Sequence, residues 1–411
     1  SGGGLSVAST AATITGTTFS GNSTGFQGSA INAQGATLAI SNTTFSANQI
    51  TGTNGQGGAI FHFSNGTALT LTNSTFSGNT ATTSVGGVQN FGGTVRIANS
   101  VFAGNSASNN SSAVLNNALG VMTISNSRFT GNRVQNTGGA VVNNGSTLAV
   151  SSSTLAGNNA ATGGGVYLTG GTATISNSII WGNSSNLLTG ASIAHSIIQG
   201  GFAGTGNLNI DPLFVAPVAF AAAPTSTGNY HVLDHSPAID SGNNAAVPLD
   251  TFDLNDNAST TDEAPDLDGN PRRYDDTGVA DTGSGAAPVV DMGAFEKQTN
   301  SPPTFPMDVD YCNLQFPTSF TAAAGSSTPI IYGRIYEDDN GVLTSTAGAH
   351  PSIVAQVGHG PLGSDPRGGT KPTSKSSTYH RLASTAGARP QRAATPTTSS
   401  SIAMATLTSA R

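Results

Sequence analysis

The first half of the sequence has almost no charged residues. Residues 1–210 contain Arg96, Arg128 and Arg133 but no Lys, Asp or Glu. Nucleic-acid binding needs many Lys and Arg side chains, so this half predicts no nucleic-acid partner. Glycoside hydrolysis needs two carboxylates, and this half supplies none. We expect the three arginines to face solvent, with Arg128 and Arg133 close enough in sequence to offer a weak site for an anionic glycan.

Three other features are scarce. Cys312 is the single cysteine, which excludes an intramolecular disulfide framework and a multi-cysteine metal site. Aromatic residues make up 6% of the chain, which argues against a large core of bulky side chains. The sequence has no run of eighteen apolar residues, so we expect no transmembrane helix. It also opens without Met or an apolar signal segment, which is typical of a processed or truncated product.

Charge is present, but it is segregated along the chain. All 21 acidic residues lie between Asp211 and Asp365, and from Pro366 onward the sequence has Lys and Arg but no acid. The chain therefore consists of three compositionally different parts in series.

A repeat of about 26 residues fills the neutral part. Copies align on an Asn that follows Gly in most of them, at spacings of 26, 31, 26, 27, 26 and 25 residues. These residues are Asn22, Asn48, Asn79, Asn105, Asn132, Asn158 and Asn183. Such self-similarity is the signature of a solenoid.

Two apolar columns run through the same copies. One lies three residues before each Asn and consists of Phe19, Phe45, Phe76, Phe102, Phe129, Leu155 and Ile180. The other lies five residues earlier and runs from Ile14 through Ile40, Leu71, Ile97, Ile124 and Val150 to Ile175. Each copy offers three short β-favouring pieces separated by Gly and Asn, without the spacing of a helix. The repeat therefore predicts an all-β, right-handed parallel β-helix of about eight coils.

Stacked coils explain how a chain so rich in Ser, Thr, Asn and Gly can fold. Every strand N–H and C=O pairs with the coils above and below, so bulky side chains are needed only in narrow columns. We expect the Phe column and the Ile/Leu/Val column to point inward, and the Asn column to form a ladder of side-chain amides. "ISNSIIWGN" (175–183) matches "IAHSIIQGG" (193–201), which predicts a shorter final coil with His195 as a turn residue.

The sequence resembles known surface proteins at several places. Its units resemble the repeats of bacterial β-helix proteins of the polymorphic outer membrane protein type. "NLNIDPLFV" (207–215), "YHVLDHSPAIDSGNN" (230–244), "DLDGNPRRY" (266–274) and "VDMGAFE" (290–296) together resemble the choice-of-anchor Q family of secreted bacterial proteins. This resemblance covers about residues 90–296. It implies a β-helix closed by its C-terminal region and a secreted or cell-surface location, and it implies no reaction.

The same features predict five parts of the chain. Residues 1–205 form the β-helix, 206–297 an acidic, loop-rich closing region, and 298–306 a Pro-rich linker. Residues 307–365 alternate like strands and resemble the start of a β-sandwich module that is incomplete. Residues 366–411 are either a disordered basic tail or the product of a shifted reading frame.

The acidic closing region is where ion chemistry is expected. "DLNDN" (253–257) and "DLDGN" (266–270) place oxygen ligands at alternate positions, as a calcium loop requires. The candidate ligands are Asp253, Asn255, Asn257, Asp266, Asp268 and Asn270. Neither stretch completes a calcium-binding loop with a closing Glu, so a solvated acidic turn remains the alternative. The resemblance assigns six residues to the closing structure, where Arg272 could pair with Asp291 or Glu296. These residues are Asp240, Asp266, Asp268, Arg272, Asp291 and Glu296.

Three functions fit the sequence. The first is a non-enzymatic extracellular β-helix, adhesin- or stalk-like, that binds glycans or partner proteins or associates with itself through its strand edges. The second is a polysaccharide lyase or hydrolase whose catalytic groups come from the acidic region folded back over the coils. The third is a structural subunit of an extracellular filament. No cofactor is predicted other than calcium.

Overall fold

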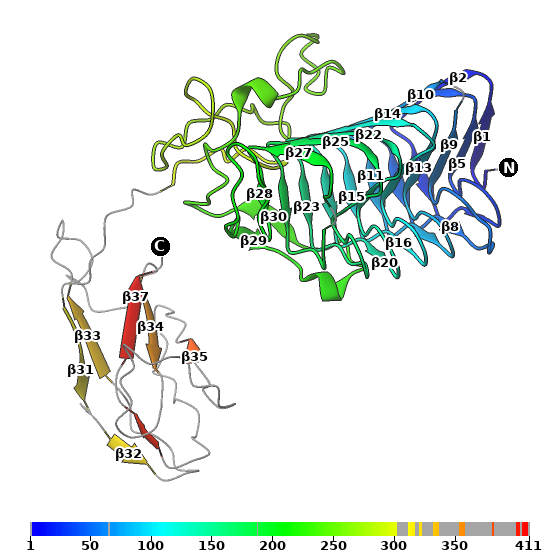
Figure 1. Cartoon of the computed structure of the whole chain (residues 1–411). Coiled ribbons are helices and arrows are strands. Elements are labelled where there is room, and N and C mark those ends of the chain that lie inside the picture. The colour runs from blue at the N-terminus through cyan, green and yellow to red at the C-terminus, as the bar shows by residue number, and fades with distance from the viewer. Residues whose placement is uncertain are drawn as a thin grey trace. The chain divides into compact units, whose positions relative to one another are not determined.

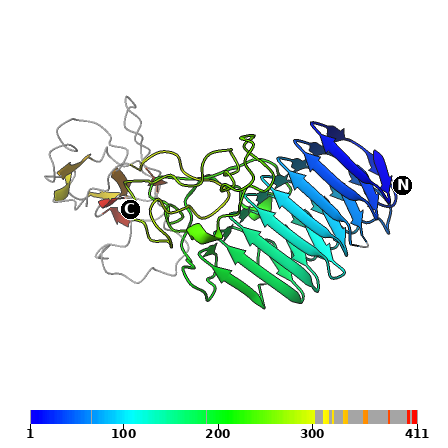
Figure 2. The same ribbon diagram turned by 90° about the horizontal axis from the view of Figure 1, so that it is seen from above.

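Residues 5–198 form the successive turns of a parallel β-helix (Figures 1 and 2). The computed structural model describes residues 2–64, 66–186 and 188–301, together with the backbone of strands β31–β37 beyond residue 310. The chain divides into two compact units, residues 1–302 and 303–411. The all-β solenoid predicted from the repeat is confirmed, with about seven turns and a shorter last one.

Three long sheets build the walls of the coils. The first sheet has seven strands, which are β1 (Leu5–Ala8), β5 (Ile31–Gln34), β9 (Ile60–Phe63), β13 (Val88–Phe91), β17 (Val114–Asn117), β21 (Val141–Asn143) and β24 (Val166–Leu168). The second has eight, which are β2 (Ala11–Thr15), β6 (Thr37–Ser41), β10 (Ala68–Thr72), β14 (Thr94–Ala98), β18 (Val121–Ser125), β22 (Ser146–Ser151), β25 (Gly171–Ser176) and β27 (Ala191–Ala194). The third also has eight, which are β3 (Thr18–Ser20), β7 (Thr44–Ser46), β11 (Thr75–Ser77), β15 (Val101–Ala103), β19 (Arg128–Thr130), β23 (Thr154–Ala156), β26 (Ile179–Trp181) and β28 (Ile197–Ile198).

A fourth, narrow sheet adds to the three strands per coil that the repeat predicts. Its five strands are β4 (Ser23–Thr24), β8 (Gln49–Ile50), β12 (Thr80–Ala81), β16 (Ser106–Ala107) and β20 (Arg133–Val134). Each has two residues and directly follows the Asn of its copy, a length too short for an alternating pattern to show in the sequence.

The strand register aligns the columns seen in the sequence. Ile14 pairs with Ile40 in the second sheet, and Phe19 pairs with Phe45 in the third. In the last coil Ile175 pairs with Ile193, which is the alignment expected for the shorter final copy. Identical side chains therefore lie directly above one another along the stack.

The interior consists of these stacked columns. Neighbouring rings of the Phe column are 4.4–5.2 Å apart between centroids and within 8° of parallel. Leu155, Ile180 and Ile198 continue the column, and all three are buried. Because each strand contributes one or two apolar residues to a shared column, a chain with few aromatic residues still builds a continuous core.

Sharp corners between the second and third sheets depend on residues with positive φ. The corner residues are Asn42, Asn73, Asn99, Asn126, Ser152, Asn177 and His195, with φ between 45° and 50°. We call them the corner column. His195 is thus a turn residue, as its alignment predicts, and its backbone N–H donates to Thr205 O. Asn tolerates this conformation better than most residues do, which explains its recurrence.

The closing region after the coils has little regular structure. It contains β29 (Phe214–Ala216), which pairs antiparallel with β30 (Asn229–Val232), and the short 3-10 helices η1 (Phe220–Ala222) and η2 (Asn244–Ala246). In Figure 2 its yellow-green loops lie alongside the coil stack. In the described part of the chain, no helix combines the length and apolar character that crossing a bilayer demands.

The second unit is described only by its strands. β31 (Tyr311–Phe316) pairs with β33 (Tyr332–Tyr336), and β32 (Phe320–Ala322) pairs with β36 (Ser400–Ile402). β34 (Ile353–Val357) lies between β35 (His380–Arg381) and β37 (Ala405–Ser409), and all these pairs are antiparallel. The remainder of the predicted sandwich module and basic tail lies outside the described residues, as does the predicted linker from residue 302.

Candidate functional site

The closing region is bound to the coils along the corner column. Four successive coils each offer a corner side chain or backbone group to the closing region, so its loops lie across the stack. The hydrogen bonds are Asn99 Nδ2 to Asp266 O (3.1 Å), Arg272 Nη2 to Asn126 Oδ1 (2.9 Å) and Ser152 O (3.2 Å), and Asn177 Nδ2 to Asn243 O (2.9 Å). The acidic region therefore folds back over the coils.

A second apolar core lies between the closing region and the outer face of the third sheet. Outward residues of this sheet are polar in the early coils, for example Thr18 and Thr44, but apolar in the last coils, where Ile179 and Ile197 are buried. They pack with Phe214, Tyr230, Ala238, Met292, Ala294 and Phe295. Sequence reasoning missed this surface, although the adjacent Ile pairs of "SIIW" and "SIIQ" indicate a strand buried on both faces.

Arg272 is the buried cation of this interface. Its guanidinium donates to Gly293 O, Ala294 O and Ser152 O as well as to Asn126. Among the residues that the structure describes it forms no salt bridge, so the predicted pairing with Asp291 or Glu296 is wrong. Burial lowers the pKa of Arg272, and the charges of nearby carboxylates, Glu296 first, oppose that effect. Arg272 joins the loops to the coils because it lies where many carbonyls converge.

The buried carboxylates of the closing region mostly accept backbone N–H groups. Asp291 accepts from the N–H groups of Asp240 and Lys297, and Glu296 accepts from those of Tyr274 and Asp291. Burial raises the pKa of Asp291 to about 7, and burial with the Asp291 charge raises the pKa of Glu296 well above its usual value. These carboxylates stabilise the loops by accepting hydrogen bonds from backbone N–H groups that have no partner in regular secondary structure.

A cavity of about 440 Å³ lies where the closing loops meet the third to fifth coils. Its lining is half coil and half loop. The coil side consists of Asn73, Ser74, Thr75, Asn99, Val101 and Arg128, and the loop side of His231, Leu254, Leu267, Asp268, Gly269 and Phe295. Hydroxyl and amide groups thus face apolar side chains across a space that holds three ionisable groups.

Arg128 supplies the positive charge of this cavity. The prediction that it faces solvent is wrong, because the closing region half-buries it and places its guanidinium 5.8 Å from the centroid of the Tyr230 ring. Its Nε is buried, and the described residues provide no hydrogen-bond partner for it. Burial lowers the pKa of Arg128, while the charges of Tyr230 and Asp268 act in the opposite direction. Arg133 and Arg96, by contrast, are exposed.

His231 and Asp268 lie together on the loop side. Asp268 Oδ2 is 2.6 Å from His231 Nε2, and His231 Nδ1 lies 2.7 Å from Asn229 Oδ1. The imidazole ring also stacks on Phe295, with centroids 4.0 Å apart. Both ring nitrogens face oxygen atoms, so the ring has a fixed orientation. Asp268 is the one carboxylate among the lining residues.

The six residues predicted to bind calcium lie in two loops, and hydrogen bonds within each loop stabilise its turns. In the first loop Asp253 accepts from Ala258 N, and Asn255 and Asn257 accept from N–H groups two residues ahead. In the second loop Asp266 Oδ1 accepts from Asp268 N and Asn270 N, around Gly269 with φ 87°. The Asp268 carboxylate is hydrogen-bonded to His231 Nε2. Calcium at these two loops stays a prediction.

The Asn residues of the repeat form a ladder. In each step from Asn22 to Asn183, the side-chain Nδ2 donates to the Oδ1 of the next copy at 2.9–3.0 Å. The same Oδ1 also accepts the backbone N–H of the preceding Asn. From Asn48 onward each Nδ2 also donates to a carbonyl of a neighbouring coil, as Asn105 does to Phe76 O.

A second ladder of side-chain hydrogen bonds between coils was not predicted from the sequence. His62 Nδ1 lies 3.1 Å from Asn90 Oδ1, and the amides of Asn90, Asn116 and Asn143 follow at 2.9 Å. All four side chains are buried. The signal was an Asn two residues after the Val of "VQN", "VLN" and "VVN" in successive copies. Burial lowers the pKa of His62, against the opposing effect of its hydrogen bonds.

The comparison with known proteins supports the β-helical assignment of the coil-forming part of the chain. Residues 3–180 match a family model described as right handed beta helix region. This match supports the right-handed β-helix family for the coil-forming part of the chain. No curated protein and no solved structure matches the sequence.

Proposed function

We propose that this chain is an extracellular, non-enzymatic β-helix protein of a bacterial surface, adhesin- or stalk-like, which binds an acidic glycan in the cavity around Arg128. The β-helix of residues 3–180 supports the general class. The resemblance to the choice-of-anchor Q family supports a secreted location. The site rests on one observation, the half-buried Arg128 guanidinium whose buried Nε has no hydrogen-bond partner among the described residues.

A guanidinium in this position favours an anionic ligand. Five N–H donors fixed in a plane match a carboxylate, and partial burial strengthens the charge-assisted bond. Asp268 is already engaged by His231, so it leaves the Arg128 charge uncompensated by a direct contact. A uronic-acid residue combines a carboxylate with a hydroxylated ring, which suits the Asn73 amide and the Thr75 hydroxyl of the lining.

The cavity also provides the mixed surface that a sugar ring needs. Leu254 and Leu267 offer apolar contact, and the amide and hydroxyl groups of the third and fourth coils offer hydrogen bonds. Hydrolysis by the usual pair of carboxylates would require a second acid in the lining, where Asp268 stands alone. Binding without cleavage is therefore the function that the lining supports best.

Calorimetry with oligosaccharides of uronic acids tests this proposal. We expect binding to the wild-type chain, and Arg128→Gln should weaken it by at least about tenfold because a charge-assisted bond is lost. Arg96→Gln is the matched control, since Arg96 is exposed on the second sheet away from the cavity lining. Equal affinity of the Arg128→Gln variant, or binding of neutral oligosaccharides alone, would refute the site.

A polysaccharide lyase or hydrolase is the second candidate. One observation favours it, namely that the closing loops bring His231 and Asp268 into the same cavity as Arg128. Incubation with a panel of acidic and neutral polysaccharides, with and without calcium, separates the two. Release of unsaturated or reducing ends would replace binding by catalysis as the function. Electron microscopy of the purified protein would reveal the third possibility, a filament subunit.

A further inference from the structure

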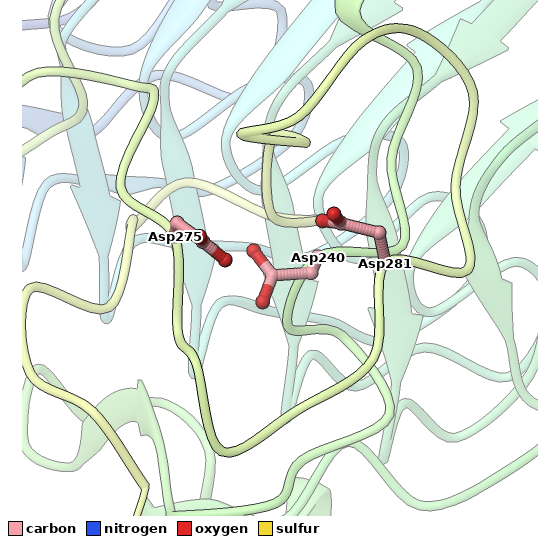
Figure 3. A group of neighbouring side chains, drawn as sticks. All are labelled: Asp240, Asp275 and Asp281. Carbon is pink, nitrogen blue, oxygen red and sulfur yellow. The ribbon is translucent and has the colours of Figure 1, made fainter.

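Three acidic side chains meet in the closing region outside the cavity. One carboxylate oxygen from each of Asp240, Asp275 and Asp281 lies within 4.8 Å of the others. Figure 3 shows Asp275 and Asp281 at the two ends of one loop, with their carboxylates beside that of Asp240. Asp240 is buried, whereas the other two are exposed. The group is therefore open to solvent on one side.

Asp240 is unusual among the buried acids. Its residue is 0% exposed, and neither carboxylate oxygen has a hydrogen-bond partner among the described residues. Asp266, Asp276 and Asp291 are buried to a similar degree, but each accepts two or more hydrogen bonds. Buried polar groups without partners are rare in folded proteins, and a carboxylate in this state indicates a ligand.

The backbone holds Asp240 firmly in this position. Its N–H donates to Asp291 Oδ1 at 2.8 Å, and its C=O accepts from Thr282 N and Gly283 N at 2.9 and 3.1 Å. The two bonds to the Asp240 C=O also place Asp281, the residue before Thr282, beside Asp240. The carboxylates thus converge because main-chain bonds fix both segments, despite the repulsion between like charges.

No basic side chain neutralises the group among the described residues. Lys297, whose side chain is 8% exposed, forms its ion pairs with Asp234 and Asp276 at 3.0 and 3.6 Å. Burial raises the pKa of Asp240 to about 7, and the charges of Asp291, Asp281, Asp275 and Asp276 add to this effect. A cation between the three carboxylates would remove both costs.

We propose that Asp240, Asp275 and Asp281 bind a calcium ion that joins the segment of Asp240 to the loop of residues 275–281. All the available ligand atoms are carboxylate oxygens, which hard divalent cations prefer. Irregular loops suit the flexible coordination of calcium better than the strict octahedron of magnesium, and the two exposed acids leave room for water ligands. This site is separate from the loops of residues 253–257 and 266–270, and it does not depend on glycan binding.

Calcium titration of the full chain, stripped first with a chelator, tests the site. Calorimetry should show calcium binding to the wild-type chain, and the melting temperature should rise by about 2–4 °C in about 1 mM calcium. The Asp275→Asn/Asp281→Asn double variant should lose at least tenfold in affinity and the thermal shift. Both residues are exposed, so the variant leaves no buried hole.

A second double variant serves as the matched control. Asp211→Asn/Asp234→Asn removes the same charge from exposed acids outside every candidate calcium loop, and we expect it to bind calcium like the wild type. The proposal is overturned if the wild-type chain binds no calcium, if Asp275→Asn/Asp281→Asn binds it unchanged, or if the control variant is the one that loses binding. Magnesium should bind more weakly than calcium, and the reverse order would refute the assignment of the ion.

Discussion

Arg272 Nη2 donates to Asn126 Oδ1 over 2.9 Å, although the two residues are 146 positions apart in the chain. Asn126 belongs to the corner column of the fifth coil, and Arg272 belongs to an acidic loop. The bond joins the neutral repeat to the charged closing region at a fully buried point. The corner that turns each coil thus also provides the attachment point for the loops that form the cavity.

Replacing Arg272 should detach the closing region. Arg272→Met would leave the carbonyls of Gly293, Ala294 and Ser152 buried without this donor, and we expect the free energy of unfolding to fall by about 3–5 kcal/mol. Arg273→Met is the matched control, because Arg273 is paired with Glu263 at a third-exposed position and should cost about 0–1 kcal/mol. Urea denaturation measures both, and equal stability of the two variants would contradict the role of Arg272.

The Asn ladder should cost more to break in its middle than at its first step. Asn105→Ala removes the acceptor of both the Asn79 N–H and the Asn79 amide, which are buried, and should destabilise the chain by about 2–5 kcal/mol. Asn22→Ala removes no acceptor used by another Asn and should cost less. Asn136→Ala, at an exposed position, should change stability by less than about 0.5 kcal/mol. Equal losses for Asn105→Ala and Asn136→Ala would show that the ladder contributes little.

Two glycines that directly follow strands of the third sheet should respond differently to the same substitution. Gly78 and Gly131 have φ of 61° and 58°, so alanine strains the backbone at both by roughly 1–2 kcal/mol. A Cβ at Gly78 would have no neighbour within 4 Å, but at Gly131 it would lie 2.1 Å from Thr225 O. Gly131→Ala should therefore cost more than Gly78→Ala and expose the segment around Thr225 to protease. Identical unfolding free energies of the two variants would show that Thr225 does not lie against Gly131.

His62 should make stability depend on pH. Burial lowers its pKa in the folded chain below the unfolded value of about 6.5, so below that pH the unfolded chain takes up a proton that the folded chain resists. The free energy of unfolding should then fall with decreasing pH, by at most about 1.4 kcal/mol per unit. His62→Asn, which matches Asn90 in the next coil, removes this contribution. If wild type and variant show the same profile between about pH 5 and 7.5, His62 does not titrate as inferred.

Much of the coil architecture could be predicted from the sequence, because the solenoid repeats one local arrangement. Phe76 pairs with Phe45 and Phe102 since each copy aligns with the next, and an offset of one copy fixes every contact. The second ladder was harder to find, because His62 interrupts the Asn pattern. Arg128 was wrongly expected to face solvent, because its surroundings come from Tyr230 and Asp268, about a hundred residues or more further along.

The sequence by itself determined the β-helix, its inward columns and the positive-φ corners, because a periodic pattern specifies contacts between neighbouring copies. Only the tertiary structure decided how the acidic loops lie on the coils, which places Arg128 beside a cavity and brings Asp240, Asp275 and Asp281 together. Those loops have no period and almost no secondary structure. Their path is set by single hydrogen bonds between residues far apart in the chain, and no spacing in the sequence records such bonds.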